Sequence, residues 1–410
     1  MRILEKVLGS IEVTRSLKLL IFIGGLYSLS IALSNTFVNV FLWKQTGEII
    51  DIALYNLAIV ISQPLAFIVA GKLAKKIDRI VVLRIGVILL SFFYLTVLFF
   101  GNNANSYIIV LGILLGTGYG FYWLAYNVLT FEITEPETRD FFNGFLGIMT
   151  SFSGIIGPIF AGFVISSMEK FTGYKIIFLF SLALFVGAVV LSFFLKRRSA
   201  KGFFAFQLVF QEQKVNKNWR NVLIAHFFQG LREGVFTFII VIWVYITTKS
   251  EMAIGTFSFL MSFTQLIAYY VVARFISEKY RKKAILAGGV ILYLSILIIV
   301  FNVTYPALLV YAVIISVAYP LLLVPYQSIT YDVIGTARKA AEHRVEYIVF
   351  RELYVNLGRI LSIVTFVLCV HFFKEQSIRY VMLILGSGHF ILYFFIKNVS
   401  LKKRVNEAML

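Results

Sequence analysis

The sequence has little charge, one cysteine and four histidines, and each shortage excludes a class of protein. Only 14% of the 410 residues are charged, whereas a soluble protein carries about a quarter charged residues. Because 60% of the residues are hydrophobic, the composition indicates an integral membrane protein. With Cys369 alone, neither a disulfide framework nor a cysteine-based metal site can form. The histidines are scattered without the spacing of metal ligands, so we expect no metal and no cofactor.

Twelve apolar runs are long enough to cross a bilayer, which takes about 20 residues. They lie near residues 17–43, 51–70, 80–100, 107–131, 142–168, 174–195, 220–247, 252–275, 284–302, 305–331, 346–370 and 377–397. The longest polar stretch, 196–219, separates six spans from six. We therefore expect an all-α membrane protein with a six-helix bundle in 1–195, a cytoplasmic linker at 196–219 and a second six-helix bundle in 220–410.

The basic residues are distributed unevenly between the two sides of the predicted membrane. If the N-terminus is cytoplasmic, most of the 38 lysines and arginines fall in cytoplasmic segments, as the positive-inside rule requires. The net charge of +18 then reflects topology and does not indicate nucleic-acid binding. The first apolar run is too long for the core of a cleavable signal peptide. We expect a multi-pass protein of the cell membrane with both termini in the cytoplasm.

The two halves of the chain resemble each other at corresponding places. The segment "GKLAKKIDRIVVL" (71–83) follows the second span, and "ARFISEKYRKKAI" (273–285) follows the eighth. Likewise "YNVLTFE" (126–132) closes the fourth span, and "YQSITYD" (326–332) closes the tenth. Two matches at equivalent places predict duplicated six-helix units, which is the parallel-repeat plan of many transporters.

The segment after the second span also matches a known motif. With Gly71 and Arg79 in place, it resembles motif A of the major facilitator superfamily. Lys75 stands where that family has an aspartate, and Asp78 stands where it has a second glycine. The resemblance implies a cytoplasmic gate that involves Gly71, Asp78 and Arg79, with Asp78 in the acidic role.

The fifth span carries "GIIGPIFAG" (154–162), which resembles motif C of the same superfamily, a mark of antiporters and exporters. Gly154, Gly157 and Gly162 leave one helix face bare, so a neighbouring helix can approach closely. Pro158 removes one backbone hydrogen bond and favours a kink. Tight packing and a gating pivot both remain open for this segment. The resemblance covers essentially the whole chain and is greatest for the multidrug-permease-like branch of Gram-positive bacteria.

Two predicted spans carry a stripe of polar side chains with an additional arginine beside it. In the seventh span these residues are His226, Gln229, Glu233 and Arg232. In the eleventh span they are Glu352, Asn356, Arg359 and Arg351. Glu233 lies about 20 Å into its helix, close to the membrane midplane. His226 either carries protons, because histidine titrates near neutral pH, or bonds a neighbour.

Three interpretations of these charges remain open. Arg351 and Glu352 could lie at the cytoplasmic edge and extend their charged ends into water. The arginines and glutamates could instead form a static network of ion pairs. Arg232, Glu233 and Arg359, the deepest of them, could line a central cavity and bind substrate or protons, which is the interpretation that we favour. The surplus of arginine then suits an anionic group on the substrate.

The first half offers aromatic rings and amides without deep charge. Asn35 and Asn39 share one face of the first span, and Tyr122 and Trp123 lie within the fourth. Such side chains suit a bulky amphipathic ligand. The alternative is that the aromatic residues anchor the helix at the membrane interface.

Acidic residues end the fourth and tenth spans on the cytoplasmic side. Glu132 is predicted to pair with Arg139, and Asp332 with Arg338 or Arg344, when the gate closes. The alternative is that both carboxylates are only solvated.

The sequence thus predicts a secondary active transporter rather than an enzyme. We expect a monomeric, proton-coupled exporter of an amphipathic small molecule or drug, with an anion as one candidate, which works by alternating access among membrane lipids. Another coupling ion is the alternative to protons. The alternatives are an importer or lipid flippase of the same fold, or a scaffold or sensor without transport. No phosphate-binding loop signature occurs, so ATP is not expected to drive the process directly.

Overall fold

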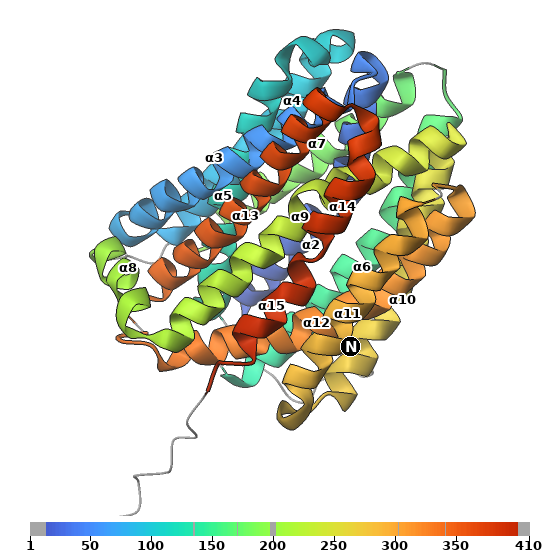
Figure 1. The fold of residues 1–410 in the computed structure, drawn as a ribbon. Coiled ribbons are helices and arrows are strands. Elements are labelled where there is room, and N and C mark those ends of the chain that lie inside the picture. The colour runs from blue at the N-terminus through green and yellow to red at the C-terminus, as the bar shows by residue number, and fades with distance from the viewer. Residues whose placement is uncertain are drawn as a thin grey trace, which may run out of the picture.

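The computed structural model describes residues 14–133, 136–169, 171–196, 202–301, 303–340 and 342–400; of residues 102, 131–133, 136–145 and 273 it describes the backbone alone. The regular elements of these ranges are all helical (Figure 1). In chain order they are α2 (Arg15–Thr46), α3 (Ile49–Lys76), α4 (Arg79–Phe100), η1 (Gly101–Tyr107), α5 (Ile108–Ile133), α6 (Pro136–Ser166), α7 (Thr172–Phe193), α8 (Phe206–Val215), α9 (Lys217–Thr248), α10 (Glu251–Phe275), η2 (Glu278–Tyr280), α11 (Arg281–Val300), α12 (Tyr305–Thr336), α13 (Arg344–Phe373), η3 (Glu375–Ser377), α14 (Ile378–Gly386) and α15 (Gly388–Ile396).

Within the described ranges, 12 helices are long and apolar enough to cross a membrane, which confirms the predicted class and number of spans. We call α2–α7 the N-terminal bundle and α9–α15 the C-terminal bundle. Because the number of spans is even, the start of α2 and the end of α15 lie on one side, here called the terminal side. The other side is called the far side.

Side-chain caps fix where several of these helices begin. Asp78 accepts a hydrogen bond from the backbone N–H of Ile80 at 2.9 Å and so starts α4. Asn216 caps α9, and Ser250 caps α10, in the same way. Each cap satisfies one N–H that the first turn of a helix leaves without a partner. The long apolar runs predicted the spans, and these short polar residues define their starts.

The structure departs from the predicted spans in three places. The linker predicted as polar contains a helix, α8. The last span is divided at Ser387 into α14 and α15. The second span continues to Lys76, so that Lys75 lies in the last helical turn of α3 and not in a loop.

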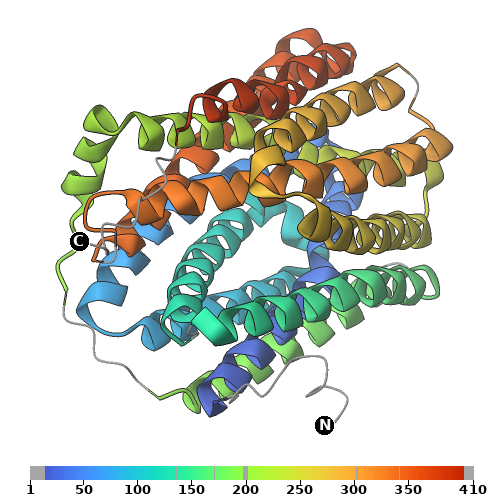
Figure 2. The ribbon, with the colours of Figure 1, turned by 90° about the horizontal axis from the view of Figure 1, so that it is seen from below.

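The two bundles meet along two seams. In one seam α3 packs along α13, and in the other α6 packs along α10 (Figures 1 and 2). Helices α3 and α13 are spans two and eleven, and α6 and α10 are spans five and eight. Counted within each bundle, both seams therefore join the second span of one bundle to the fifth span of the other. This exchange is what a two-fold relation between two duplicated bundles produces.

Glycines allow the α6–α10 seam to close tightly. A Cβ atom built on Gly154 would lie 2.8 Å from the Ser262 hydroxyl, and one on Gly162 would lie 2.8 Å from the Glu251 carbonyl oxygen. A Cβ on Gly157 would instead lie 2.9 Å from Ala32 of α2. The glycines predicted to permit close approach therefore do so, two of them at the seam between the bundles. Their part in gating remains a proposal.

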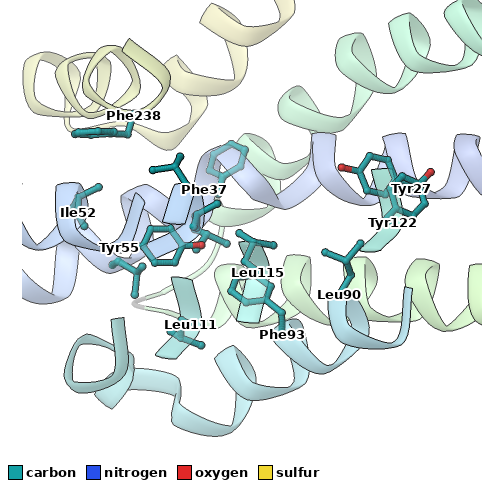
Figure 3. Packing of buried hydrophobic residues seen from close by; sticks show 14 of the residues in the cluster. Tyr27, Phe37, Ile52, Tyr55, Leu90, Phe93, Leu111, Leu115, Tyr122 and Phe238 are labelled. Carbon is teal, nitrogen blue, oxygen red and sulfur yellow. The ribbon is translucent and has the colours of Figure 1, made fainter. Parts of the chain in front are cut away.

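A continuous apolar core runs through both bundles. It includes Phe37 and Tyr55 of the N-terminal bundle and Phe238 of the C-terminal bundle, and Figure 3 shows part of this packing. Polar side chains placed inside such a core are costly unless they find partners there.

Candidate functional site

An ion pair joins the midpoints of two helices in the C-terminal bundle. Glu233 lies at the middle of α9, and Arg359 lies at the middle of α13. The Arg359 Nη2 and Nε atoms donate to Glu233 Oε2 at 2.6 and 3.2 Å. A charge half-way across a membrane normally pairs with another charge or faces a cavity. Here the pair keeps some access, because 25% of the Arg359 side chain and 12% of the Glu233 side chain are exposed.

The pair forms because α9 and α13 cross at unusually close range. A Cβ atom on Gly230 would collide with the Val355 carbonyl oxygen, and one on Gly358 would collide with the Phe227 carbonyl oxygen. Only glycine fits at these two positions without separating the helices. The crossing places Gly358 beside Arg359, so the same contact that joins the backbones brings the charges together.

The second oxygen of Glu233 is satisfied by neutral donors. Gln229 Nε2 donates to Glu233 Oε1 at 2.9 Å, and the Tyr319 hydroxyl of α12 donates to the same oxygen at 2.8 Å. Gln229 Oε1 also lies 2.9 Å from His226 Nδ1, and His226 Nε2 lies 3.3 Å from the Thr330 hydroxyl. The predicted stripe of the seventh span is therefore one connected chain of hydrogen bonds that ends at the ion pair.

A second ion pair lies nearer the terminal side of α13. Arg351 Nη2 donates to Glu352 Oε1 at 2.6 Å, and their side chains are 13% and 16% exposed. Asn356, which is fully buried, donates to the Glu352 backbone carbonyl at 2.9 Å and accepts from Arg359 Nη1 at 3.4 Å. The stripe predicted in the eleventh span thus connects the two ion pairs.

Arg232 lies apart from these pairs. It is 5% exposed, donates to the Tyr311 hydroxyl at 3.4 Å and stacks over the Phe236 ring at 4.7 Å. Among the described side chains, no carboxylate lies within ion-pair distance of it. His389 of α15 is fully buried, and neither of its ring nitrogens has a hydrogen-bond partner among the described residues. The favoured interpretation grouped Arg232 with Glu233 and Arg359, and the structure places Arg232 apart from their ion pair.

Stacked aromatic rings occupy the middle of the N-terminal bundle. Tyr27 of α2 and Tyr122 of α5 stack with their ring centres 3.9 Å apart, as Figure 3 shows. Trp123 meets both rings edge-on, at 5.2 and 5.4 Å, and Tyr126 extends the stack. Tyr122 is buried, whereas Trp123 is 36% exposed. Of the two aromatic residues predicted to bind ligand, only Trp123 offers an accessible face.

The two predicted amides of α2 are engaged within their own bundle. Asn39 accepts a hydrogen bond from Asn56 Nδ2 of α3 at 2.8 Å. Asn35 accepts one from the Tyr119 hydroxyl of α5 at 3.0 Å. Both amides therefore tie neighbouring helices of the N-terminal bundle, and their predicted contact with a ligand remains a proposal.

An ion pair bridges the two bundles on the terminal side. Lys75 of α3 lies 3.1 Å from Glu346 Oε1 of α13 and donates to the Glu342 carbonyl at 2.6 Å. Glu346 is fully buried, and its Oε1 also accepts the backbone N–H of Ala205 at 2.9 Å. Gly71 of α3 also lies against Val349 of α13, so the two bundles are in contact at this point of the seam.

A second ion pair bridges the bundles on the far side. Lys44 Nζ in the last turn of α2 lies 2.7 Å from Glu251 Oε1, at the start of α10. The Tyr174 hydroxyl also donates to that oxygen at 2.9 Å. In both bridges the lysine ends a helix of the N-terminal bundle and the glutamate begins a helix of the C-terminal bundle. Each charge therefore has the sign that the adjacent helix end favours.

The other predicted gate residues have different surroundings. Asp332 pairs with Arg281 of the same bundle at 2.9 Å, not with Arg338 or Arg344, so that predicted partner was wrong. The physical reason is that Arg281, at the start of α11, lies beside the end of α12. Asp78 is buried and acts as a helix cap.

Two further residues of the predicted gate, Glu132 and Arg139, have side chains outside the described part of the structure. Arg79 begins α4, and its predicted part in the gate remains a proposal.

Sequence analysis missed Lys75 and Glu346 as partners, although one signal was available. A lysine at the position where motif A has an aspartate reverses the charge there and so favours an acidic partner, and Glu346 lies in the first turn of the helix that follows the last long loop. No local signal identified Tyr319, because its role depends on a contact between distant helices. Within the described residues, no three His, Cys, Asp or Glu side chains cluster as a metal site requires.

Comparisons with known proteins agree with this architecture. The Major Facilitator Superfamily profile matches residues 20–363. The uncharacterized protein YqgE of Bacillus subtilis (strain 168) is 56% identical over 405 residues, which cover 98% of this chain and 94% of that protein. An uncharacterized protein in the sodM 3′ region of Geobacillus stearothermophilus is 63% identical over 179 residues, which cover 44% of this chain and 84% of that protein.

Two solved structures have a similar fold. The crystal structure of the human organic anion transporter MFSD10 (TETRAN) has a TM-score of 0.67 at 14% identity and covers 94% of this chain and 100% of that one. A bacterial homologue of the iron transporter ferroportin, in an outward-facing state with soaked iron, has a TM-score of 0.65 at 17% identity, with coverage of 94% and 100%. These likenesses concern the fold alone.

The twelve-span fold defines a multi-pass membrane transporter rather than an enzyme. The chain belongs to the Major Facilitator Superfamily. Membership of this superfamily implies a small-molecule substrate.

Proposed function

We propose that the chain is a proton-coupled secondary transporter of an amphipathic anion in the cell membrane, with the terminal side in the cytoplasm. The observation that carries the proposal is the Glu233–Arg359 pair at the middle of two spanning helices. A carboxylate at that depth is a site where a proton changes the local charge. A guanidinium beside it is a forked donor that suits a carboxylate or phosphate.

The pair couples the two ligands by competition for Arg359. When Glu233 is charged, it occupies the donors of Arg359. When Glu233 takes up a proton, the attraction between the two side chains falls, and Arg359 becomes free to bind an anion. The accessible face of Trp123 in the other bundle suits the apolar body of such a substrate. The similar human structure is of an organic anion transporter, in accord with this substrate class.

The two bridges between the bundles suit alternating access. Opening to the cytoplasm has to break Lys75–Glu346, and opening to the outside has to break Lys44–Glu251. Proton and substrate binding at mid-depth would bias which bridge is broken, because a ligand shifts an equilibrium by its different affinity for the two states.

Export is the direction that the motif C resemblance in α6 and the sequence resemblance to the multidrug-permease-like branch favour, and it requires the proton and the substrate to bind in turn. Import by cotransport is a second candidate, and the ion pair itself favours it. Because protonation of Glu233 frees Arg359, proton and anion bind together rather than in turn. A proton gradient directed inward would then carry the anion inward.

The test is proton movement in liposomes that contain the purified protein and an internal pH dye. A transported anion added outside should acidify the lumen under cotransport, whereas exchange should make the lumen more alkaline. Glu233→Gln should abolish either signal, and Glu278→Gln, at an exposed carboxylate, is the matched control. Normal proton flux in both Glu233→Gln and Glu352→Gln would refute coupling at these carboxylates.

A further inference from the structure

A cavity of about 790 Å³ lies beside the Lys75–Glu346 bridge. One wall is α8 with the segment that precedes it, and the other is the segment that connects α12 with α13. Figure 1 shows α8 at one end of the bundle, next to the start of α13. The mid-membrane site lies half-way along the spanning helices, so this cavity is a different place in the molecule.

The two walls differ in chemistry. The α8 wall is largely apolar, with Phe204, Leu208 and Val215 facing the cavity. The opposite wall carries Arg338 and His343. The Nδ1 atom of His343 is buried and has no hydrogen-bond partner among the described residues. This atom lies 3.7 Å from Glu346 Oε1, so His343 connects the cavity wall with the carboxylate of the bridge.

Acidic and amide groups also line the cavity and limit what it can hold. Glu212 accepts a hydrogen bond from Asn216 Nδ2 at 3.2 Å, so its carboxylate is already engaged at the start of α9. Gln207 and Gln211 add neutral donors and acceptors. Among the described residues the walls therefore hold one carboxylate, Glu212, and one guanidinium, Arg338, and an anionic group suits Arg338.

The cavity wall also holds the bridge between the bundles. Ala205 lines the cavity, and its backbone N–H donates to Glu346 Oε1 at 2.9 Å. The same oxygen lies 3.1 Å from Lys75 Nζ and 3.7 Å from His343 Nδ1. Any occupant that packs against Ala205 and His343 therefore acts on the carboxylate that Lys75 contacts across the seam.

We propose that this cavity is a regulatory site for an amphipathic anion, a carboxylate or phosphate joined to an apolar body. Its anionic group binds Arg338, and its apolar body packs on Phe204 and Leu208. The occupant holds the linker against Glu346 and so keeps the Lys75–Glu346 bridge formed. The binding site stands independently, whereas the effect on transport rests on the proposed function.

Binding is tested on the purified protein in phosphatidylcholine nanodiscs by calorimetric titration with dodecyl phosphate. The wild-type protein should bind dodecyl phosphate and ignore dodecyl trimethylammonium. Arg338→Ala and Leu208→Asp should each weaken binding at least tenfold. Lys339→Ala removes an equal charge from the neighbouring, exposed position and should change affinity less than twofold.

Two further binding experiments identify the source of the anion. Inorganic phosphate that competes with dodecyl phosphate would point to a free small anion. If nanodiscs that contain phosphatidylglycerol no longer bind added dodecyl phosphate, the natural occupant is a lipid headgroup. Equal affinity of wild type, Arg338→Ala and Leu208→Asp would overturn the site, whatever the outcome of the transport assay.

The effect on the bridge is measured separately, by the distance between spin labels at positions 72 and 339 in a Cys369→Ser background. Dodecyl phosphate should narrow this distance distribution toward the closed form, and Arg338→Ala should remove the change. If dodecyl phosphate binds but leaves the distribution unchanged, the regulatory role is refuted and the binding site stands.

Discussion

Half-way along its helices, the N-terminal bundle holds stacked aromatic rings, whereas the C-terminal bundle holds an ion pair at the same height. Among the described residues, Tyr27 and Tyr122 stack on each other beside further aromatic rings, while Glu233 and Arg359 are held in a network of donors. Rings lose little on leaving water, but buried charges are stable only when paired. The two bundles thus differ in chemistry at this level, since one suits an apolar body and the other suits charge.

Both bundles have helices in close contact at glycines, and they differ in what lies beside the contact. In the N-terminal bundle, Gly112 and Gly116 of α5 lie against the backbone of α3, and amides such as Asn39 and Asn56 connect neighbouring helices. In the C-terminal bundle, α9 and α13 are in backbone contact at two glycines, and the ion pair lies next to one of them. A change at that crossing therefore affects packing and charge together, whereas a change among the aromatic rings affects packing alone.

The largest effect is expected from Gly358→Leu. The new side chain collides with the Phe227 carbonyl, so α9 and α13 must separate, and overpacking of this kind costs about 3 kcal/mol. Thermal unfolding in detergent should show a marked loss of stability and poor yield of folded protein. Gly335→Leu in α12 is the control, because a Cβ there meets nothing within 4 Å. Equal stability of the two variants would contradict the close crossing.

Breaking the ion pair should lower the free energy of unfolding by less, but it tests most directly the difference between the two bundles. Glu233→Gln or Arg359→Gln leaves one buried charge unpaired, and because the pair is partly exposed we expect a loss of about 2 kcal/mol each. The double variant should recover part of this loss. A double-mutant cycle from thermal unfolding measures the coupling, and strictly additive losses would mean that the two side chains do not interact.

The two bridges should have opposite effects on access. Lys75→Gln leaves Glu346 without its partner and should populate the form open on the terminal side. Lys44→Gln leaves Glu251 without its lysine and should populate the form open on the far side. We expect shifts in population of severalfold, because each pair is partly shielded from water.

Spin labels measure these populations in proteoliposomes. Labels at positions 72 and 339 report the terminal side, and labels at 48 and 304 report the far side. Each lysine variant is the control for the other, since both lose one positive charge. If both variants increase the distance between the labels on the same side, the bridges do not act as separate gates.

The smallest effect is expected in the aromatic half. Trp123→Ala removes the accessible ring face and should weaken the apparent affinity for an aromatic substrate by roughly tenfold or less, since one ring stack is worth about 1 kcal/mol. The ratio of protons to substrate should stay unchanged, because the ion pair is intact. Transport assays over a range of substrate concentration give both quantities. A changed ratio of protons to substrate would mean that the C-terminal bundle alone does not determine coupling.

The fold and the depth of the site could be predicted from sequence, but not most of the partnerships. Counting along apolar runs placed Glu233 and Arg359 deep within their spans, and the structure has both near the midpoints of their helices. The same counting could not separate Arg232 from them, because its direction depends on how α9 packs against α12 and α15. Nor could it join Lys75 to Glu346, which lie in different bundles.

The sequence by itself determined the twelve spanning helices, because an apolar run of the right length has no other stable state in a bilayer. It also determined which residues are too polar to face lipid. Only the tertiary structure decided their partners. Glu233 binds Arg359 because two glycines allow α9 and α13 to touch, and Lys75 reaches Glu346 because the seam brings two helix ends of opposite charge together. Such contacts depend on distances between helices, and a linear pattern carries no record of those distances.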